Sequence, residues 1–310
     1  MEMNRGIKLL ITCVAFILVC CGHSGNAVKS GNTVKAQFSA AVAPMGPEKV
    51  ADYYRAAGGK KGAGLKTAMG SIIYNRRERQ YNELWSDFKK TDIRSDGKIW
   101  DIYSGITAYE PVTKGKSYSK EGDCYNREHS FPNSWFGGNV LPMYTDLHHI
   151  YPTDGYVNNR RANYPFGETE GERYKSEKGF SKLGRCTYPG YSGIVFEPND
   201  EFKGDLARTY FYMVTCYEEK LADWFNKYGD KGGVRQTIDG TTYPGLTGWQ
   251  LEMLMKWAAA DPVSEKEVQR NNAVYEIQRN RNPFIDFPGL ERLIWGDRRN
   301  IPFSPANYDK

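Results

Sequence analysis

Apolar residues recur three and four positions apart over several segments of the chain, which is the spacing of one face of an α-helix. The first two segments are separated by a Gly- and Lys-rich turn, GGKKGAG, at 58–64. The segment DLARTYFYMVTCYEEKLADWF is expected to be mostly buried. We predict helices over residues 48–57, 64–77, 84–94, 205–225 and 248–261.

A further helix is predicted to begin after Ser264. Glu267 follows three residues later, and this spacing is that of a capping box, in which each side chain bonds the other's backbone N–H. Farther along, Asn271 and Asn272 stand where a packing helix would place leucine. Two interpretations stay open: a half-exposed helix, or one wall of a cleft whose amides and arginines meet phosphates, namely Arg270, Arg279 and Arg281.

Strands are expected to be few and short. The segment IWDIYSG, residues 99–105, is interpreted as a strand that leads into a loop. Residues 111–165 contain scattered Gly, Pro, Asn and Asp and no long periodic element. We therefore predict an α+β fold with many helices, in one domain over residues 47–310.

Composition and charge narrow the class of protein. Hydrophobic residues make up 40% of the chain and aromatic residues 14%, which is enough for a large core and excludes a disordered chain. The formal net charge of +5 is mildly basic. Such a charge is compatible with a polyanionic partner but does not establish one.

The N-terminal residues predict export. Arg5 and Lys8 precede an apolar run at 9–21, which is too short to span a bilayer comfortably, so residues 1–21 are interpreted as a secretory signal peptide. The run ends in two cysteines, as in a lipid-anchored lipoprotein, although the residues before them fit a lipobox poorly. Plain secretion, a periplasmic location and an outer-membrane lipoprotein stay open. The Ser-, Gly- and Ala-rich segment 22–46 is predicted to be a linker.

Cysteines are few after this segment. Only Cys124, Cys186 and Cys216 remain, so at most one internal disulfide is possible and the sequence does not select it. Exported cysteines tend to pair. The absence of a CxxC pair argues against a zinc-ribbon site.

Two segments contain the residues best suited to chemistry. The first is CYNREHSFPNSWF, residues 124–136, with a histidine directly after a carboxylate. The second, residues 144–167, interleaves polar residues with apolar ones that ought to be buried, and buried polar groups need partners. It is therefore a structural network or a site. Its polar residues are Asp146, His148, His149, Asp154, Asn158, Asn159, Arg160, Arg161 and Asn163.

These residue types match the needs of phosphodiester hydrolysis. A neutral histidine such as His129 can take a proton from water at neutral pH. One hard divalent cation, held by the Glu128 carboxylate and the Asn158 amide oxygen, can offset charge on the phosphate and help the leaving oxygen. Arginines such as Arg160 and Arg161 can bind a neighbouring phosphate.

Three ordered blocks give a resemblance to a known family. NREHSFPNSWF, TDLHHIYPTDGYVNNRRANYPFG and NRNPFIDFPGLERLIWG resemble the bacterial endonuclease I family, which comprises exported nucleases of the ββα-metal (His-Me finger) class. The likeness extends in blocks from about Tyr81 to Gly296. It implies a small ββα-metal core within the α+β domain. It also implies a largely sequence-nonspecific endonuclease that acts on DNA, with RNA as a further substrate, and that uses one Mg²⁺, Mn²⁺ or Ca²⁺ ion. No protein partner is implied.

The resemblance also implies roles for individual residues. Glu128 corresponds to a metal ligand and His129 to the general base, on or near a short strand. Asn158 corresponds to the second metal ligand, on the helix after a second strand at 145–152. His148 is expected to support the site, whereas His149 is expected to pack.

The phosphate-binding arginine is not fixed by the resemblance. Arg161 is predicted to be one of the catalytic residues, with His129 and His148. Four further arginines are candidates for contact with nucleic acid. Trp135 and Phe136 could stack on bases but are more often core residues. The four candidate arginines are Arg127, Arg160, Arg279 and Arg281.

One physical constraint applies to the adjacent pair Glu128 and His129. Neighbouring residues of a regular strand point to opposite faces, so one site can use both only at a bend, a bulge or a strand end. Pro132 and Asn126 make an irregular backbone plausible here.

Two other classes of function stay open in the sequence. An exported lipoprotein that binds nucleic acid or another polyanion without cleaving it would have the same basic balance and the same 22 tyrosines. A metal-dependent phosphatase is also conceivable, although few carboxylates lie near the histidines, which argues against a two-metal site.

Overall fold

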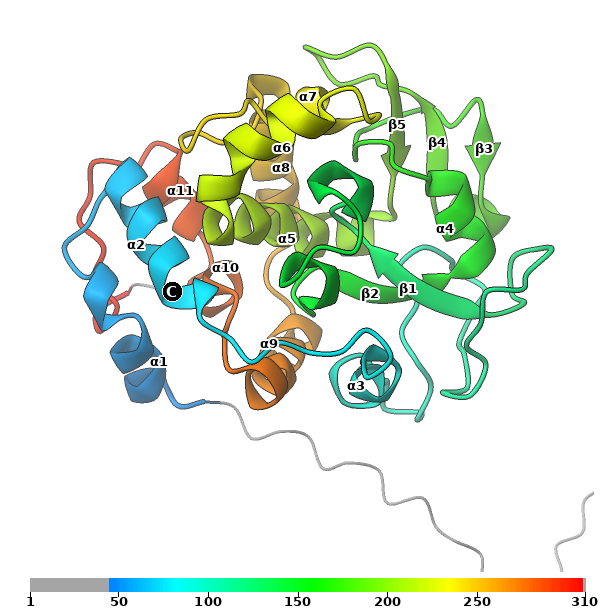
Figure 1. Cartoon of the computed structure of the whole chain (residues 1–310), viewed down its shortest axis with the longest axis horizontal. Helices are drawn as coiled ribbons and strands as arrows, with labels where there is room; N and C mark the ends of the chain where they lie inside the picture. Colours follow the sequence, from blue (N-terminus) through cyan, green and yellow to red (C-terminus); the bar gives the residue numbers. More distant parts are fainter. Residues whose placement is uncertain (1–44, 309–310) are drawn as a thin grey trace, which may run out of the picture. The chain divides into compact units, whose positions relative to one another are not determined.

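The computed structural model describes residues 45–308 (Figure 1). The predicted signal peptide and almost all of the predicted linker lie outside these residues. Within residues 45–308, no helix is both long enough and apolar enough to cross a membrane. The described residues form an α+β fold with short antiparallel sheets, as predicted.

Helices occur close to each position that the hydrophobic pattern predicted. The predicted helix over 205–225 is wrong in one respect, because α5 ends at Cys216 and a new helix, α6, begins at Leu221. Tyr217 separates them with non-helical backbone angles. The α-helices are α1 (Pro47–Tyr53), α2 (Gly62–Tyr74), α3 (Leu84–Thr91), α4 (Gly155–Arg161), α5 (Lys203–Cys216), α6 (Leu221–Tyr228), α7 (Val234–Thr237), α8 (Gly248–Ala260), α9 (Glu265–Gln278), α10 (Pro283–Asp286) and α11 (Leu290–Ile294).

The strands form two small antiparallel sheets. One pairs β1 (Tyr125–His129) with β2 (Ile150–Asp154), and the other has the order β3 (Tyr174–Lys175), β4 (Lys182–Arg185), β5 (Ile194–Glu197). The predicted strand at 99–105 is wrong. Only Ile99 makes isolated bridges there, and the Asp101 carboxylate accepts from the backbone N–H groups of Tyr103 and Ser104, a turn that competes with strand pairing.

The core is centred on α5, which is buried from Gly204 to Cys216. It packs against α2 and α8, and Figure 1 shows these helices around it. A second, smaller cluster of buried residues joins α3 and α9 to the β1–β2 pair through Leu84, Phe88, Tyr125, Ile150 and Val274, among others. This second cluster fixes the position of the β1–β2 sheet.

The start of α9 has the predicted capping box. The Ser264 hydroxyl and the Glu267 carboxylate bond each other's backbone N–H, as the sequence indicates. Asn271 is buried, and its amide bonds the Asn282 carbonyl and the Asp286 carboxylate. It therefore belongs neither to a half-exposed stripe nor to a cleft wall.

The three cysteines in the described residues are free thiols. Cys124 and Cys216 are buried, and Cys186 is half-buried. Burial raises the pKa of Cys216 to about 11, although Arg76 acts in the opposite direction. The tendency of exported cysteines to pair is thus not realised in this fold.

Close packing of α2 on α5 depends on Gly70. A Cβ at this position would lie 2.5 Å from the backbone oxygen of Thr215. We predict that Gly70→Ala lowers the free energy of unfolding by about 1–3 kcal/mol, because the helices must separate. Gly64→Ala is the matched control in the same helix, with nothing within 4 Å of its Cβ. It should raise stability by roughly 0.5–1 kcal/mol. Urea unfolding of both variants tests this, and equal effects would contradict it.

Candidate active site

Strands β1 and β2 and helix α4 form a continuous unit (Figure 1). The register places Glu128 opposite Tyr151 and His129 opposite Ile150. Strand β2 begins at Ile150 rather than at 145, because Met143–Thr145 form a 3-10 turn, η3. Its last residue, Asp154, caps α4 by accepting from the Val157 N–H at 2.9 Å, so the direction of α4 is fixed by the end of β2.

One face of β1 meets α4. The side chains of Asn126 and Glu128 lie on it, as expected for residues two apart in a strand. Asn158 donates from its amide nitrogen to Asn126 Oδ1 at 2.7 Å. Glu128 Oε1 accepts from Arg161 Nη1 and from the Tyr103 hydroxyl, each at 2.9 Å. The structure thus brings together both predicted metal ligands.

The other face of β1 presents Arg127 and His129. The His129 Nε2 atom lies 3.1 Å from the Tyr144 carbonyl oxygen, and the two rings are stacked 5.2 Å apart. The Arg127 guanidinium lies over the rings of Tyr81, at 3.5 Å, and Trp85, at 4.2 Å. The predicted general base is therefore held by aromatic rings on the face opposite Glu128.

The strand is regular from Tyr125 to His129, with no bulge in its pairing with β2. Of the three irregularities considered from the sequence, only the strand end is found, because His129 is the last residue of β1. Within the described residues, no strand pairs with the edge of β1 that faces away from β2 at residues 126–129. The two faces are thus joined by a strand edge that pairs with no other strand, although the Arg161 guanidinium donates to the His129 carbonyl oxygen at its end.

Burial dominates the electrostatics of Glu128. It raises the pKa of this carboxyl to about 7, against the opposite effects of Arg161, Tyr103 and Asn158. A bound cation would lower the pKa again. Among the described residues, no group of three or more His, Cys, Asp or Glu side chains is placed to hold a metal. The donor set at this face is instead one carboxylate with the amides of Asn126 and Asn158, hard oxygen donors that fit Mg²⁺ with several of its own waters.

His129 is neutral at neutral pH. Burial lowers its pKa to about 3, and His149 and Arg127 act in the same direction. A carbonyl oxygen can only accept, so the proton of the neutral ring is on Nε2, which donates to Tyr144. The lone pair is therefore on Nδ1, the atom that could accept a proton.

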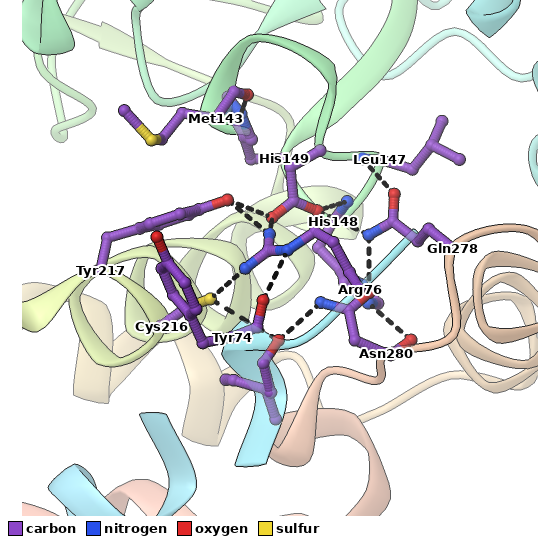
Figure 2. A network of polar contacts seen from close by, with 12 residues as sticks. Tyr74, Arg76, Met143, Leu147, His148, His149, Cys216, Tyr217, Gln278 and Asn280 are labelled. Carbon is purple, nitrogen blue, oxygen red and sulfur yellow. Dashed lines mark hydrogen bonds and ion pairs between the residues drawn. The ribbon is translucent and has the colours of Figure 1, made fainter. Parts of the chain in front are cut away.

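The other two histidines lie deeper in the fold. His149 is buried, its Nε2 bonds the Met143 carbonyl at 2.7 Å, and its ring lies 5.5 Å from that of His129. It packs, as expected. His148 is also buried, bonds the Asn280 carbonyl at 3.2 Å and lies against Tyr212. His148 is thus part of the network in Figure 2 rather than a neighbour of His129.

The candidate arginines differ in their accessibility. Arg161 is only 1% exposed and bonds Glu128 and the backbone oxygens of His129 and Ser130. Arg281 is buried in a pair with Asp286. Burial argues against direct phosphate contact by either arginine, because the Arg161 and Arg281 side chains lie inside the fold and most of their donors bond protein groups.

Three arginines remain accessible. Arg160 is exposed beside Tyr156, and Arg279 is half-exposed with Glu276 at 3.2 Å. Arg127 is partly exposed and has no carboxylate partner among the described residues. It lies two residues from His129 on the same face of β1. Trp135 and Phe136 are core residues, 0% and 2% exposed, and are not available for stacking on bases.

Sequence reasoning missed several residues around Glu128 and His129. Asn126 could have been found from strand alternation, because it is two residues from Glu128. Tyr103 and Tyr81 are brought in from loops far along the chain, and no spacing rule predicts them. Tyr144 contributes a backbone carbonyl, for which a sequence contains no signal.

An antiparallel pair followed by a helix, with Glu-His on the first strand and Asn on the helix, has the order of elements that the resemblance implies for a ββα core. The endonuclease I family model matches residues 61–289. The chain therefore belongs to the endonuclease I family.

Proteins similar to this chain are also named as nucleases. The chain is 34% identical over 272 residues to the extracellular ribonuclease of Bacillus amyloliquefaciens, covering 86% of this chain and 85% of that protein. It is 34% identical to the extracellular ribonuclease of Bacillus subtilis (strain 168), covering 82% of each chain. It is 27% identical to an extracellular deoxyribonuclease of Aeromonas hydrophila, covering 69% of this chain and 88% of that one.

The histidines beside the site make stability depend on pH. Burial lowers the pKa of His149 from 6.5 to about 4, so between these values the unfolded chain binds a proton there that the folded protein excludes. Lowering the pH from 6.5 to 4 should therefore destabilise the wild type relative to His149→Gln by up to about 1.4 kcal/mol per pH unit. Urea unfolding of both proteins at several pH values measures this, and a difference that does not change with pH would refute it.

Proposed function

We propose that this protein is an exported, metal-dependent endonuclease that hydrolyses phosphodiester bonds in nucleic acids with little sequence specificity. The observation that supports this most strongly is that Asn158 of α4 lies on the face of β1 that presents Glu128, with His129 at the end of the same strand, in a member of the endonuclease I family.

His129 is the general base. Its Nε2–H donates to the Tyr144 carbonyl, which fixes the tautomer and leaves Nδ1 as the ring atom that can accept the proton of an attacking water. Because the ring is neutral, no deprotonation step precedes the reaction at neutral pH. The stacked ring of Tyr144 limits rotation of the imidazole.

Glu128 and Asn158 would hold the cation. When bound, a hard divalent ion at these residues supplies positive charge to the phosphate and to the leaving oxygen. Arg161 and Tyr103 hold Glu128 Oε1, and Asn126 holds the Asn158 amide, so both ligands are oriented before any ion arrives. Arg161 is then a positioning residue for the carboxylate rather than a phosphate ligand.

Arg127 is the arginine that binds the substrate phosphate. Its guanidinium is held between Tyr81 and Trp85 and is not neutralised by a carboxylate among the described residues. A phosphodiester that lies across the unpaired edge of β1 could reach His129 and Arg127 on one face and the cation on the other. Contacts of this kind are made to the phosphate and carry no base information, in agreement with low sequence specificity.

Both DNA and RNA are proposed as substrates. Two relatives with 34% identity are named extracellular ribonucleases and a more distant one an extracellular deoxyribonuclease. These names also support export of this chain. The exported protein is either freely secreted or attached to a membrane through a lipid anchor.

Cleavage assays test the general base and the metal together. Wild-type protein with Mg²⁺ should degrade plasmid DNA and RNA, and EDTA should abolish both activities. We expect His129→Ala to lower kcat by roughly 10²–10⁴-fold, because the water loses its proton acceptor, with little change in nucleic-acid binding.

Two results would count against this account. Unimpaired cleavage by His129→Ala would remove His129 from the role of base. Salt-sensitive binding by the wild type without cleavage at any Mg²⁺ concentration would favour a non-catalytic nucleic-acid-binding protein instead.

A further inference from the structure

A buried carboxylate, Asp146, accepts from several donors of a polar network that the proposed mechanism does not use. Figure 2 shows Arg76, Tyr217 and Gln278 of this network. Its Oδ2 atom accepts from the hydroxyls of Tyr212 and Tyr217, at 2.8 and 2.7 Å, and from Arg76. Its Oδ1 atom accepts from the Gln278 amide at 2.8 Å and from the His148 backbone N–H at 3.1 Å. Both oxygens of this carboxylate are thus well supplied with donors.

The side-chain donors come from three separate parts of the chain. Arg76 follows α2, Tyr212 and Tyr217 belong to α5 and its C-terminal cap, and Gln278 is the last residue of α9. Figure 2 shows Arg76, Tyr217 and Gln278 directed toward the same point. Arg76 is itself held by the Tyr74 carbonyl at 3.0 Å and by the Cys216 sulfur at 2.8 Å.

Such a network is a poor device for stability alone. Burial by itself would raise the pKa of Asp146, but Arg76 together with the two neighbouring histidines and the Gln278 amide holds the pKa well below its usual range. Removing two charges from water is costly, and an apolar pair of similar size is often at least as stable. A buried ion pair with this many directional bonds does, however, fix one geometry.

The segment whose geometry is fixed also holds His129. Asp146 directly follows η3, and the carbonyl of Tyr144 in η3 accepts from His129 Nε2 at 3.1 Å. The Asp146 carbonyl accepts from the His149 N–H at 3.2 Å, and the His149 carbonyl accepts from the N–H of Ser130 at 3.0 Å. Residues 143–149 are therefore anchored at Asp146, and they contact His129 through the Tyr144 carbonyl and the next residue, Ser130, through the His149 carbonyl.

We propose that the Arg76–Asp146 pair is a positioning element for the general base. It anchors residues 143–149 so that the Tyr144 carbonyl holds His129 Nε2–H and leaves Nδ1 free to accept the proton of water. This inference rests on the proposed function, because it assigns Arg76 and Asp146 a part in the same reaction without contact with substrate.

The test removes the pair while the volume is nearly kept. In Arg76→Met with Asp146→Asn, both charges are absent and the asparagine oxygen still accepts from the tyrosines. We expect kcat to fall by up to about 100-fold, because the base is misplaced, while KM and nucleic-acid binding change little. The matched control is Arg208→Met with Glu267→Gln, another buried pair that joins α5 to α9, and it should keep wild-type kcat.

A spectroscopic readout separates positioning from a general loss of stability. In metal-free protein labelled with ¹⁵N-histidine, long-range ¹H–¹⁵N correlations report which ring nitrogen is protonated. The chain has four histidines, and the His129 signals are those missing from His129→Ala. Wild type and control should show His129 protonated on Nε2, whereas the Arg76–Asp146 double variant should show a mixture of tautomers.

A conservative variant covers the case in which the double variant does not fold. Arg76→Lys keeps the charge beside Asp146, but the lysine cannot also reach both Tyr217 and Cys216. We expect a smaller loss of kcat than in the double variant, with the same change in the His129 tautomer.

The positioning role and the proposed function are contradicted by different results. Wild-type kcat and an unchanged His129 tautomer in the folded Arg76–Asp146 variants would overturn the positioning role, and so would an equal loss of kcat in the control pair. Full activity of His129→Ala would instead overturn the proposed function itself.

Discussion

The antiparallel pairing of β1 with β2 is the interaction on which the site depends. Its register ends β1 at His129 and ends β2 at Asp154, and the Asp154 carboxylate caps α4. α4 in turn brings Asn158 and Arg161 back onto the face of β1 that presents Glu128. A slip of one residue would move Glu128 to the face of the aromatic rings and His129 to the face of α4, so both groups would lose their partners together.

Two buried carboxylates are the second feature on which the geometry of the site depends. Glu128 is held by Arg161 and Tyr103, and Asp146 by Arg76, two tyrosines and Gln278. Both carboxylates are costly to bury, and both lie next to the segments that hold the proposed metal ligands or base. The first is itself the side chain that would meet the cation, and the second orients a backbone carbonyl that meets His129. Their common effect is to fix the geometry of the site before substrate binds.

Much of this arrangement could be predicted from the sequence where the signal is local or chemical. The Ser264–Glu267 capping box and the helices α2, α3 and α8 follow from spacing alone. The choice of Glu128, His129 and Asn158 rests on the ligand needs of a hard cation together with the resemblance to the endonuclease I family, and their roles stay predictions. The prediction of a strand at 99–105 was wrong because the Asp101 carboxylate bonds the backbone N–H of Tyr103 and so stabilises a turn. Burial of Arg161 and the carbonyl of Tyr144 could not be predicted, because both depend on contacts between residues distant in the chain. The apolar spacing continues across residues 205–225, so the sequence did not predict the helix break at Tyr217. The hydroxyl of Tyr217 donates to the Asp146 carboxylate.

The central claim is that the two faces of β1 act on one phosphate across the unpaired edge of that strand. A crystal structure of His129→Ala with a bound oligonucleotide and Mn²⁺, located by its anomalous scattering, tests it most directly. The account predicts Mn²⁺ bound by the Glu128 carboxylate, the Asn158 amide oxygen and one phosphate, with Arg127 on that same phosphate and the substituted side chain at the end of β1 facing it. Mn²⁺ bound away from Glu128, or a phosphate that contacts only one face of β1, would contradict the account.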